Sequence, residues 1–491
     1  MSRASFPARA PATCAAGVSV HLLAFVAFAF VFAAPPVAAT PIFSPAVSYA
    51  TGINPNAVAV ADLNGDGKPD IVAANSFVTT VSVFLGVGDG TLGAKTDFPV
   101  GDHPQHLAIG DLDGDSKPDL VVAGWDHLSM LLGNGDGGFD APTHLDAGAH
   151  LSFVAAIDVS GDDKLDVVAA HDAPPAVAVL LGHGDGTFGP YTDYPGYSPY
   201  ALALGDLNGD GWPDIAAADL LGGGLWVFLG DGQGTYVSGA IYSVGDSPYS
   251  NAIGDFDDDG TLDVVVASKM DNNVSVLLGN GDGTFGPPGC TPLDGTCSVA
   301  YPAGTGPSSV AVGDLDVDGR PDLAVTDESC DSLVVLAGNG DGSFTAAGAY
   351  KVGVFPEHVV IHDLNGDGRP DLVTADYFAN AVSVLLNVTT VSVRDSDLPA
   401  RFELSLAGAN PFRAGTSFEI GMPRSARVRL EVYDALGRRV RTLEDGTLPP
   451  GRHTRSWDGT SSGGSAVGPG LFFIRLSAPG VQSILKAVRV S

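Results

Sequence analysis

One acidic nonapeptide occurs seven times in this chain of 491 residues, and it constrains the fold more than any other feature. The first copy reads Asp62-Leu-Asn-Gly-Asp-Gly-Lys-Pro-Asp70, and every copy has aspartate at positions 1, 5 and 9. The other copies begin at Asp111, Asp158, Asp206, Asp255, Asp314 and Asp363. Successive copies start 47 to 59 residues apart, a period typical of propeller blades. Seven such repeats are enough to close into a ring.

The chemistry of these acidic loops suits calcium, which takes about six to eight oxygen ligands. Side chains at positions 1, 3, 5 and 9 and the backbone carbonyl at position 7 supply such a set, and the glycines at positions 4 and 6 of the first copy let the chain turn tightly. A single copy could be an ordinary solvated turn, but seven copies favour metal binding. We expect up to seven Ca²⁺ ions. The expected ligands are Asp62, Asn64, Asp66, Lys68, Asp70, Asp111, Asp113, Asp115, Lys117, Asp119, Asp158, Ser160, Asp162, Lys164, Asp166, Asp206, Asn208, Asp210, Trp212, Asp214, Asp255, Asp257, Asp259, Thr261, Asp263, Asp314, Asp316, Asp318, Arg320, Asp322, Asp363, Asn365, Asp367, Arg369 and Asp371.

An EF-hand begins with the same pattern, but the residues that follow exclude it. An EF-hand needs a bidentate glutamate at position 12 and a helix on each side of the loop. Position 12 is Ala73 in the first copy, and no copy has a carboxylate there. The apolar run Ile71-Val-Ala-Ala74 after the first loop is typical of a β-strand.

Each repeat is predicted to form four short antiparallel strands. In the first repeat these are residues 57–61, 71–74 and 81–85 and a strand ending near Gly101, with a Gly-Asp-Gly turn before the last strand. The seventh repeat stops at Asn387 without this turn, whereas residues 43–52 read like the second half of a repeat. We therefore expect the N-terminal segment to supply the outer strand of the last blade and to close the ring.

Motifs after the turns, such as Phe188-Gly-Pro190 and Phe285-Gly-Pro-Pro288, occur together with the acidic loops. In this combination residues 40 to 390 resemble the FG-GAP, or VCBS, repeats of integrin α-chain heads and of many secreted bacterial proteins. The resemblance implies an all-β, seven-bladed β-propeller of four-stranded blades, with calcium between the first two strands of a blade. The third loop departs from the pattern, with Ser160 at position 3 and Asp163 at position 6, so calcium is least expected there.

Charge divides the chain. Residues 40–393 hold 48 acidic and 8 basic residues, a net charge of −40, whereas residues 394–491 hold 9 and 14, a net charge of +5. Such an acidic propeller is not expected to bind nucleic acid or an anionic membrane.

Residues 1–39 read as a signal peptide, with an apolar stretch from Val18 to Ala34; the alternative is an uncleaved anchor. No membrane span is expected after its removal. In the oxidising compartment that export implies, Cys290 and Cys297 are expected to form a disulfide, with Cys330 an odd thiol.

Residues 394–491 contain Asn410-Pro-Phe412, Trp457-Asp-Gly459 and Pro469-Gly-Leu-Phe-Phe-Ile-Arg-Leu476. They resemble the C-terminal immunoglobulin-like sorting domain of type IX secretion cargo and the related FlgD-like Ig module. The resemblance implies a small β-sandwich recognised by the secretion machinery, and hence a secreted or outer-membrane-associated protein of a bacterium. A purely structural Ig cap is the alternative.

No catalytic constellation is apparent, so no catalytic residue is assigned. The face opposite the acidic loops is predicted to bind an unknown protein or glycan. The candidate ligand residues are His106, Tyr200, Tyr249, Glu357 and His358 near the axis, and Phe77, Trp125, His127, Tyr377 and Phe378 farther out; the alternative is that the aromatic side chains only cover the tops of the blades. We predict an exported binding or adhesion module; the alternative is a carbohydrate-active enzyme, a polysaccharide lyase or hydrolase, which the scarcity of arginine outside the loops disfavours.

Overall fold

The computed structural model describes residues 40–389 except 288–289, and residues 401–490 with gaps at 407–409, 411, 414, 423, 425, 436–437, 449–450, 462–466 and 480. The chain divides into two compact units between Thr390 and Val391. In the described part, no helical segment has the length and hydropathy of a membrane crossing. The predicted signal peptide and the segment joining the two units lie outside the described residues.

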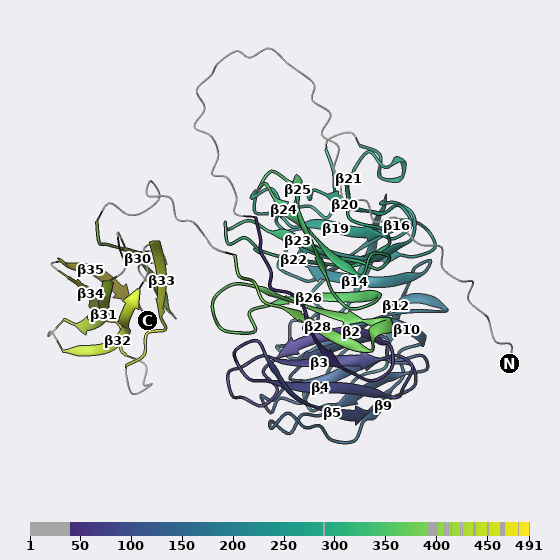
Figure 1. Ribbon diagram of the computed structural model, residues 1–491, viewed down its shortest axis with the longest axis horizontal. Helices are drawn as coiled ribbons and strands as arrows, with labels where there is room; N and C mark the ends of the chain where they lie inside the picture. Colours follow the sequence, from purple (N-terminus) through teal and green to yellow (C-terminus); the bar gives the residue numbers. More distant parts are fainter. Residues whose placement is uncertain are drawn as a thin grey trace, which may run out of the picture. The chain divides into compact units, whose positions relative to one another are not determined.

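The first unit consists of seven four-stranded antiparallel sheets, which confirms the predicted propeller (Figure 1). Blades one to three are β2 (Pro55–Ala61), β3 (Asp70–Asn75), β4 (Thr80–Gly86) and β5 (Leu92–Pro99); β6 (His106–Gly110), β7 (Asp119–Ala123), β8 (Leu128–Leu131) and β9 (Thr143–Leu145); and β10 (Ala149–Ile157), β11 (Asp166–Ala173), β12 (Pro175–Leu180) and β13 (Thr192–Pro195). Blades four to six are β14 (Pro199–Gly205), β15 (Asp214–Asp219), β16 (Gly224–Gly230) and β17 (Tyr236–Ser243); β18 (Pro248–Gly254), β19 (Asp263–Ser268), β20 (Asn273–Leu277) and β21 (Val299–Pro302); and β22 (Pro307–Gly313), β23 (Asp322–Asp327), β24 (Ser332–Gly338) and β25 (Phe344–Lys351). Blade seven is β26 (Pro356–His362), β27 (Asp371–Asp376), β28 (Ala381–Leu385) and β1 (Val47–Ala50).

The second strand of each blade is mostly apolar, since the neighbouring blades cover both of its faces. Every residue of β3 is buried, and its Ile-Val-Ala-Ala run packs against the blades on either side. Between blades one and two, for example, Val72, Val81, Leu107 and Leu120 belong to one buried hydrophobic cluster. The core is therefore a series of layers between neighbouring blades, and each acidic loop is anchored at the end of a buried strand.

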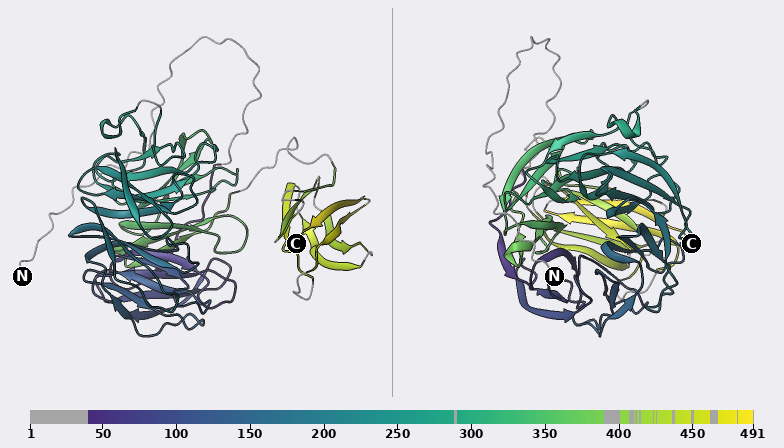
Figure 2. Two further views of the ribbon diagram at one scale, coloured as in Figure 1. Left: turned by 180° about the vertical axis from the view of Figure 1, so that it is seen from behind. Right: turned by 90° about the vertical axis from the view of Figure 1, so that its right-hand side faces the viewer.

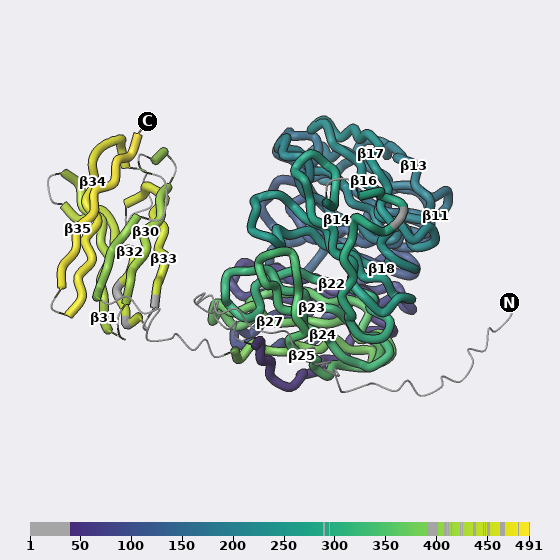
Figure 3. Tube along the Cα trace, turned by 90° about the horizontal axis from the view of Figure 1, so that it is seen from above, coloured from purple at the N-terminus to yellow at the C-terminus, as the bar shows by residue number. Residues whose placement is uncertain are grey.

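The ring closes as predicted, because β1 pairs with β28 in antiparallel register from Val47–Val384 to Ala50–Ala381. Outside the strands, the Ile42 N–H donates to Oγ1 of Thr389 at 2.8 Å, and the Val388 N–H donates to the carbonyl of Ile42 at 2.8 Å. The purple N-terminal strand thus completes the green last blade (Figures 2 and 3).

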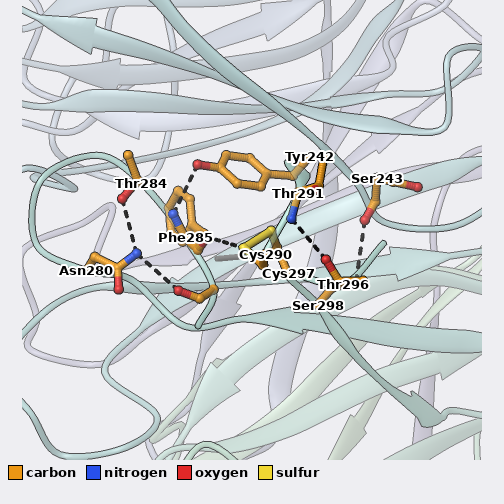
Figure 4. The surroundings of a disulfide bond; sticks show 11 residues. Tyr242, Ser243, Asn280, Thr284, Phe285, Cys290, Thr291, Thr296, Cys297 and Ser298 are labelled. Atoms are coloured by element: carbon orange, nitrogen blue, oxygen red, sulfur yellow. Dashed lines mark hydrogen bonds between the residues drawn. A yellow bond between two sulfur atoms is a disulfide. The ribbon is translucent and has the colours of Figure 1, made fainter. Parts of the chain in front are cut away.

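A disulfide joins Cys290 to Cys297 in the insertion of the fifth blade, as expected (Figure 4). The insertion also contains the 3-10 turn η1 (Pro292–Asp294). Cys330 is disulfide-bonded as well, so the expectation of an odd free thiol is wrong.

The second unit is a small β-sandwich. One sheet contains β29 (Glu403–Leu406), β30 (Thr416–Met422) and β33 (Gly451–Trp457). The other contains β32 (Arg439–Leu448), β31 (Ala426–Asp434), β34 (Gly470–Ala478) and β35 (Val481–Arg489). Alternate residues of these strands form its core, in which Trp457 packs with Phe412 and Phe472.

Candidate metal loops and ligand face

All seven acidic loops occupy the same place in the fold. Each begins directly after the first strand of a blade, and its position 9 is the first residue of the second strand, as Asp70 is of β3. This is the location that the sequence resemblance implied. The loops of all seven blades therefore lie at one end of the propeller, which we call the loop face.

The aspartate at position 9 links its loop to the third strand of the blade by two hydrogen bonds, which together we call the brace. Asp70 is buried, and its Oδ2 atom accepts a hydrogen bond from the Leu63 N–H at 2.9 Å, while Oδ1 accepts one from the Gly86 N–H, at the end of the third strand, at 2.7 Å. The equivalent pair of hydrogen bonds occurs in every blade. Sequence reasoning treated position 9 only as a ligand and missed this brace. Each carboxylate oxygen keeps a further lone pair, so the brace is compatible with metal coordination.

The remaining aspartates organise the loop itself. In the first loop, Asp62 accepts hydrogen bonds from the N–H groups of Asp66 and Gly67 at 3.1 and 2.8 Å. Lys68 at position 7 forms an ion pair of 3.1 Å with Asp66 at position 5, and this contact lowers the pKa of the Asp66 carboxyl. Basic residues at position 7 form the same pair in four other loops.

Three loops gather three carboxylates whose ligand atoms all lie within 4.8 Å of one another. These groups are Asp111, Asp113 and Asp115; Asp255, Asp257 and Asp259; and Asp314, Asp316 and Asp322. In the third group Asp316 is only 1% exposed, and its Oδ2 atom has no hydrogen-bond partner among the described residues. Burial and the neighbouring carboxylates raise the pKa of Asp316 to about 7. A buried, unpartnered oxygen beside other carboxylates fits a hard divalent cation.

At the opposite end lies what we call the opposite face, formed by the loops that enter the first strands and those between second and third strands. Seven equivalent residues, each six positions before the first aspartate of a loop, line the mouth of the central channel there. In six blades a β-bulge occurs at this point of the first strand. The seven residues are Asn56, Gln105, Ser152, Tyr200, Tyr249, Ser308 and Glu357, and the cavity that they line measures about 50 Å³.

The structure brings together all five residues that the sequence placed near the axis. Two of them connect neighbouring blades: Nδ1 of His106 lies 3.1 Å from the Val154 carbonyl oxygen, and Nδ1 of His358 accepts from the Val58 N–H at 3.5 Å. Burial lowers the pKa of His106 to about 3 and that of His358 to about 4, so both imidazoles are neutral. These contacts give the two histidines a structural role.

A charged group that the sequence did not single out lies beside the channel mouth. Lys269, directly after β19, places Nζ 4.0 Å from the ring centroid of Tyr249 and forms an ion pair with Glu328. The Tyr249 ring lies 4.4 Å from that of Tyr200. Burial raises the pKa of Glu357 to about 7, an effect that Lys269 opposes. Only spatial proximity of blades four to seven reveals this cluster.

Large apolar side chains are exposed at equivalent places on the opposite face. Five of the seven loops between second and third strands carry one, namely Phe77, Trp125, Leu221, Met270 and Phe378, with exposed fractions of 63, 48, 83, 68 and 58%. His127, also predicted as a ligand residue, instead packs against His144 with ring centroids 4.0 Å apart. Its Nε2 atom is buried, whereas the residue as a whole is partly exposed.

Comparison with protein families now identifies the repeats. A model described as FG-GAP-like repeat matches residues 62–122, 111–169, 158–217, 206–266, 255–325 and 314–374, together more than half of the chain. The chain belongs to the FG-GAP-like repeat family. In the second unit, residues 408–480 match the FlgD Ig-like domain. No curated protein matches the chain.

The chain is also similar to solved structures. BBS1N in complex with ARL6DN is 14% identical, with a TM-score of 0.52 over 73% of this chain and 99% of that one. PorZ of Porphyromonas gingivalis, a surface component of the type-IX secretion system, is 14% identical over 86% and 58% of the two chains, with a TM-score of 0.42. The periplasmic gluconolactonase PpgL of Pseudomonas aeruginosa is 14% identical over 79% and 98%, with a TM-score of 0.45.

Proposed function

We propose that this FG-GAP protein is an exported, calcium-stabilised binding or adhesion module that acts at the surface of a bacterium or outside it. The observation that carries the proposal is the difference between the two ends of the propeller. Carboxylates gather at the loop face, whereas exposed large apolar side chains recur at equivalent positions of the opposite face. Exposed apolar groups of this kind often mark interaction sites.

Calcium would be held at the loop face by the carboxylates of positions 1, 3, 5 and 9 and by the position 7 carbonyl. The propeller has 24 carboxylates at these positions, and a bound divalent cation would relieve their mutual repulsion. The loop of Asp314, Asp316 and Asp322 offers the best-supported site because of the buried Asp316 oxygen. The loop at Asp158 offers the weakest, because Ser160 replaces a carboxylate or amide.

The Ig-like unit would direct delivery. Its resemblance to type IX cargo domains, its fold independent of the propeller core and its net charge of +5 support recognition by secretion machinery. A purely structural Ig cap would share the fold but would not affect transport.

An enzyme is the second candidate, because one observation favours it. The channel mouth contains Tyr200, Tyr249 and Glu357, and Lys269 lies beside it. The pKa of Glu357, about 7, suits proton transfer. In the propeller, arginine occurs only inside the acidic loops, but this is weaker evidence against a lyase than the sequence indicated, since Lys269 provides a cation. The cavity of about 50 Å³ is, however, too small for a sugar substrate.

Screening the mature full-length protein in calcium on a glycan array and against polysaccharides in turnover assays tests the function. We expect retention of a ligand without release of new chain ends or unsaturated products. Turnover that disappears in Glu357→Gln would overturn the proposal in favour of the enzyme.

A further inference from the structure

Seven ring side chains on the opposite face form one continuous row, which we call the aromatic strip. Along the row, neighbouring ring centroids are separated by 5.4, 4.5, 6.1, 6.2, 5.0 and 4.6 Å. In order, the row consists of His150, Trp125, His103, Phe77, Tyr377, Phe378 and Phe355. The sequence had indicated some of these residues singly, but not their continuity.

The strip is not part of the hydrophobic core. Phe77, Trp125 and Phe378 are 63, 48 and 58% exposed, and no member of the strip belongs to the buried clusters of the described residues. A row of exposed rings costs hydrophobic free energy unless something covers it. Its members come from loops of blades three, two, one and seven, which follow one another around the ring.

The backbone holds these rings in place before any ligand binds. The loops between second and third strands that carry these rings are hydrogen-bonded to loops that enter first strands: Trp125 N–H donates to the Asp102 carbonyl at 3.0 Å, and Tyr377 N–H donates to the Phe355 carbonyl at 2.9 Å. The Phe77 N–H similarly donates to the Ile53 carbonyl at 3.2 Å. A preorganised surface loses little conformational entropy on binding.

Three strip residues adopt a backbone conformation that bulky side chains avoid. The residue eight positions before a loop has positive φ in six blades, and in three of these it is Asn54, Ser247 or Gly306. In the other three it is a ring residue of the strip: His103, His150 and Phe355 have φ of 50, 58 and 64°. Non-glycine residues in this region are strained and cluster at ligand sites.

We propose that the aromatic strip binds a neutral polysaccharide chain, an inference that rests on the proposed binding function. Pyranose rings present apolar C–H faces that pack on aromatic rings, and the spacing of the rings along the strip is comparable to the length of one sugar unit. Polar groups at the edge, such as the exposed carboxylates of Asp102 and Asp172, can accept hydrogen bonds from sugar hydroxyls; Asp172 already accepts one from His150 at 3.0 Å.

Charge selects the class of polysaccharide. The propeller carries a net charge of −40, and Lys269, whose Nζ atom lies 5.8 Å from the Phe355 ring centroid, is already paired with Glu328. An anionic chain would meet repulsion from this negative charge. A neutral chain does not meet this repulsion.

The test uses the mature full-length protein in millimolar calcium, with affinity electrophoresis and titration calorimetry on soluble neutral glucans, xylans and mannans and on anionic alginate and pectate. Trp125→Ala and the double variant Phe77→Ala with Phe378→Ala remove strip rings. Leu221→Ala and Met270→Ala are matched controls, because they occupy equivalent loop positions outside the strip and are at least as exposed. Thermal melting of every variant verifies folding.

We expect wild type to bind at least one neutral polysaccharide and neither anionic one. The strip variants should lose about tenfold or more in affinity, and the controls should stay within about twofold. Equal affinity of the strip variants and wild type would overturn the proposal that the strip binds a neutral polysaccharide. Binding of anionic chains alone would overturn it too. Neither result would contradict the proposed binding function. Release of products would instead overturn the proposed function. Absence of binding to any polysaccharide, with a protein ligand captured by the same face, would show that the ligand class is wrong.

Discussion

The carboxylate of Asp70 connects its own loop to the third strand of the blade, because its Oδ1 atom accepts a hydrogen bond from the Gly86 N–H at 2.7 Å. The two residues are 16 positions apart, and Asp70 is fully buried. The aspartate at position 9 of every acidic loop therefore has a structural role that does not depend on a metal ion.

Asp70→Ala is expected to destabilise the propeller even without calcium. The substitution leaves the buried N–H of Leu63 and the partly buried N–H of Gly86 without an acceptor, at a cost of about 1–3 kcal/mol or more. The exposed Asp66 serves as the matched control, because Asp66→Ala removes a carboxylate of the same loop but no buried brace. Urea unfolding in chelator should show a loss for Asp70→Ala and little change for Asp66→Ala. Equal losses for both variants would contradict the brace.

Much of the fold could be predicted from the sequence because it depends on local patterns. The acidic loops and Gly-Asp-Gly turns define the blades, and the half-repeat at residues 43–52 predicted the pairing of β1 with β28. The brace could not be predicted, because its donor is a backbone N–H in another strand. The structural role of His106 was also hidden, since its partner Val154 belongs to the next blade. The clustering of Lys269 with Glu328 likewise depends on how blades pack.

Removing β1 is expected to open the ring. A protein that begins at Gly52 would leave β28, with its apolar Ala381-Val-Ser-Val-Leu385, as an unpaired edge. We expect a melting midpoint lower by more than about 5 °C and concentration-dependent association in analytical ultracentrifugation. Ser48→Ala, which removes only the 3.2 Å contact to Oγ of Ser383, should remain a monomer of nearly unchanged stability. A monomeric shortened protein with the wild-type midpoint would contradict the role of β1.

Glu357 is expected to make stability depend on pH. Burial raises its pKa from 4.5 to about 7 in the folded protein, against the opposing effect of Lys269, while Glu328 adds to the rise. Because the pKa of Glu357 is raised in the folded state, the folded protein still holds this proton between about pH 4.5 and 7, where the unfolded chain has lost it. The contribution of Glu357 to the free energy of unfolding is therefore fully present below pH 4.5 and is lost as the pH rises through 7.

In saturating calcium, wild type should therefore lose about 1–3 kcal/mol more than Glu357→Gln between pH 5 and 8. Urea unfolding of both proteins at each pH measures the difference, which isolates Glu357 from other titrating groups such as His358 and the tyrosines. A constant difference across this range would show that the carboxyl is not perturbed.

The Ig-like unit is expected to be needed for delivery but not for folding of the propeller. The shortened protein should end at Thr390, because Thr389 accepts a hydrogen bond from the Ile42 N–H at 2.8 Å within the propeller. It should melt like the full chain in calcium, since no strand of the seven blades comes from residues 391–491. In the native host, fractionation should find it in the periplasm. Normal amounts at the surface or in the medium would mean that the unit is a structural cap.

Thermal unfolding of the mature protein in millimolar calcium and in chelator tests the central claim, that calcium at the loop face stabilises the propeller. One site contributes about 2.7 kcal/mol at a hundredfold excess over Kd, and several sites add to this. We predict a midpoint at least about 5 °C higher with calcium, and a reduced gain for Asp316→Asn, which weakens the loop with the buried unpartnered oxygen. An identical midpoint with calcium and with chelator would contradict the account.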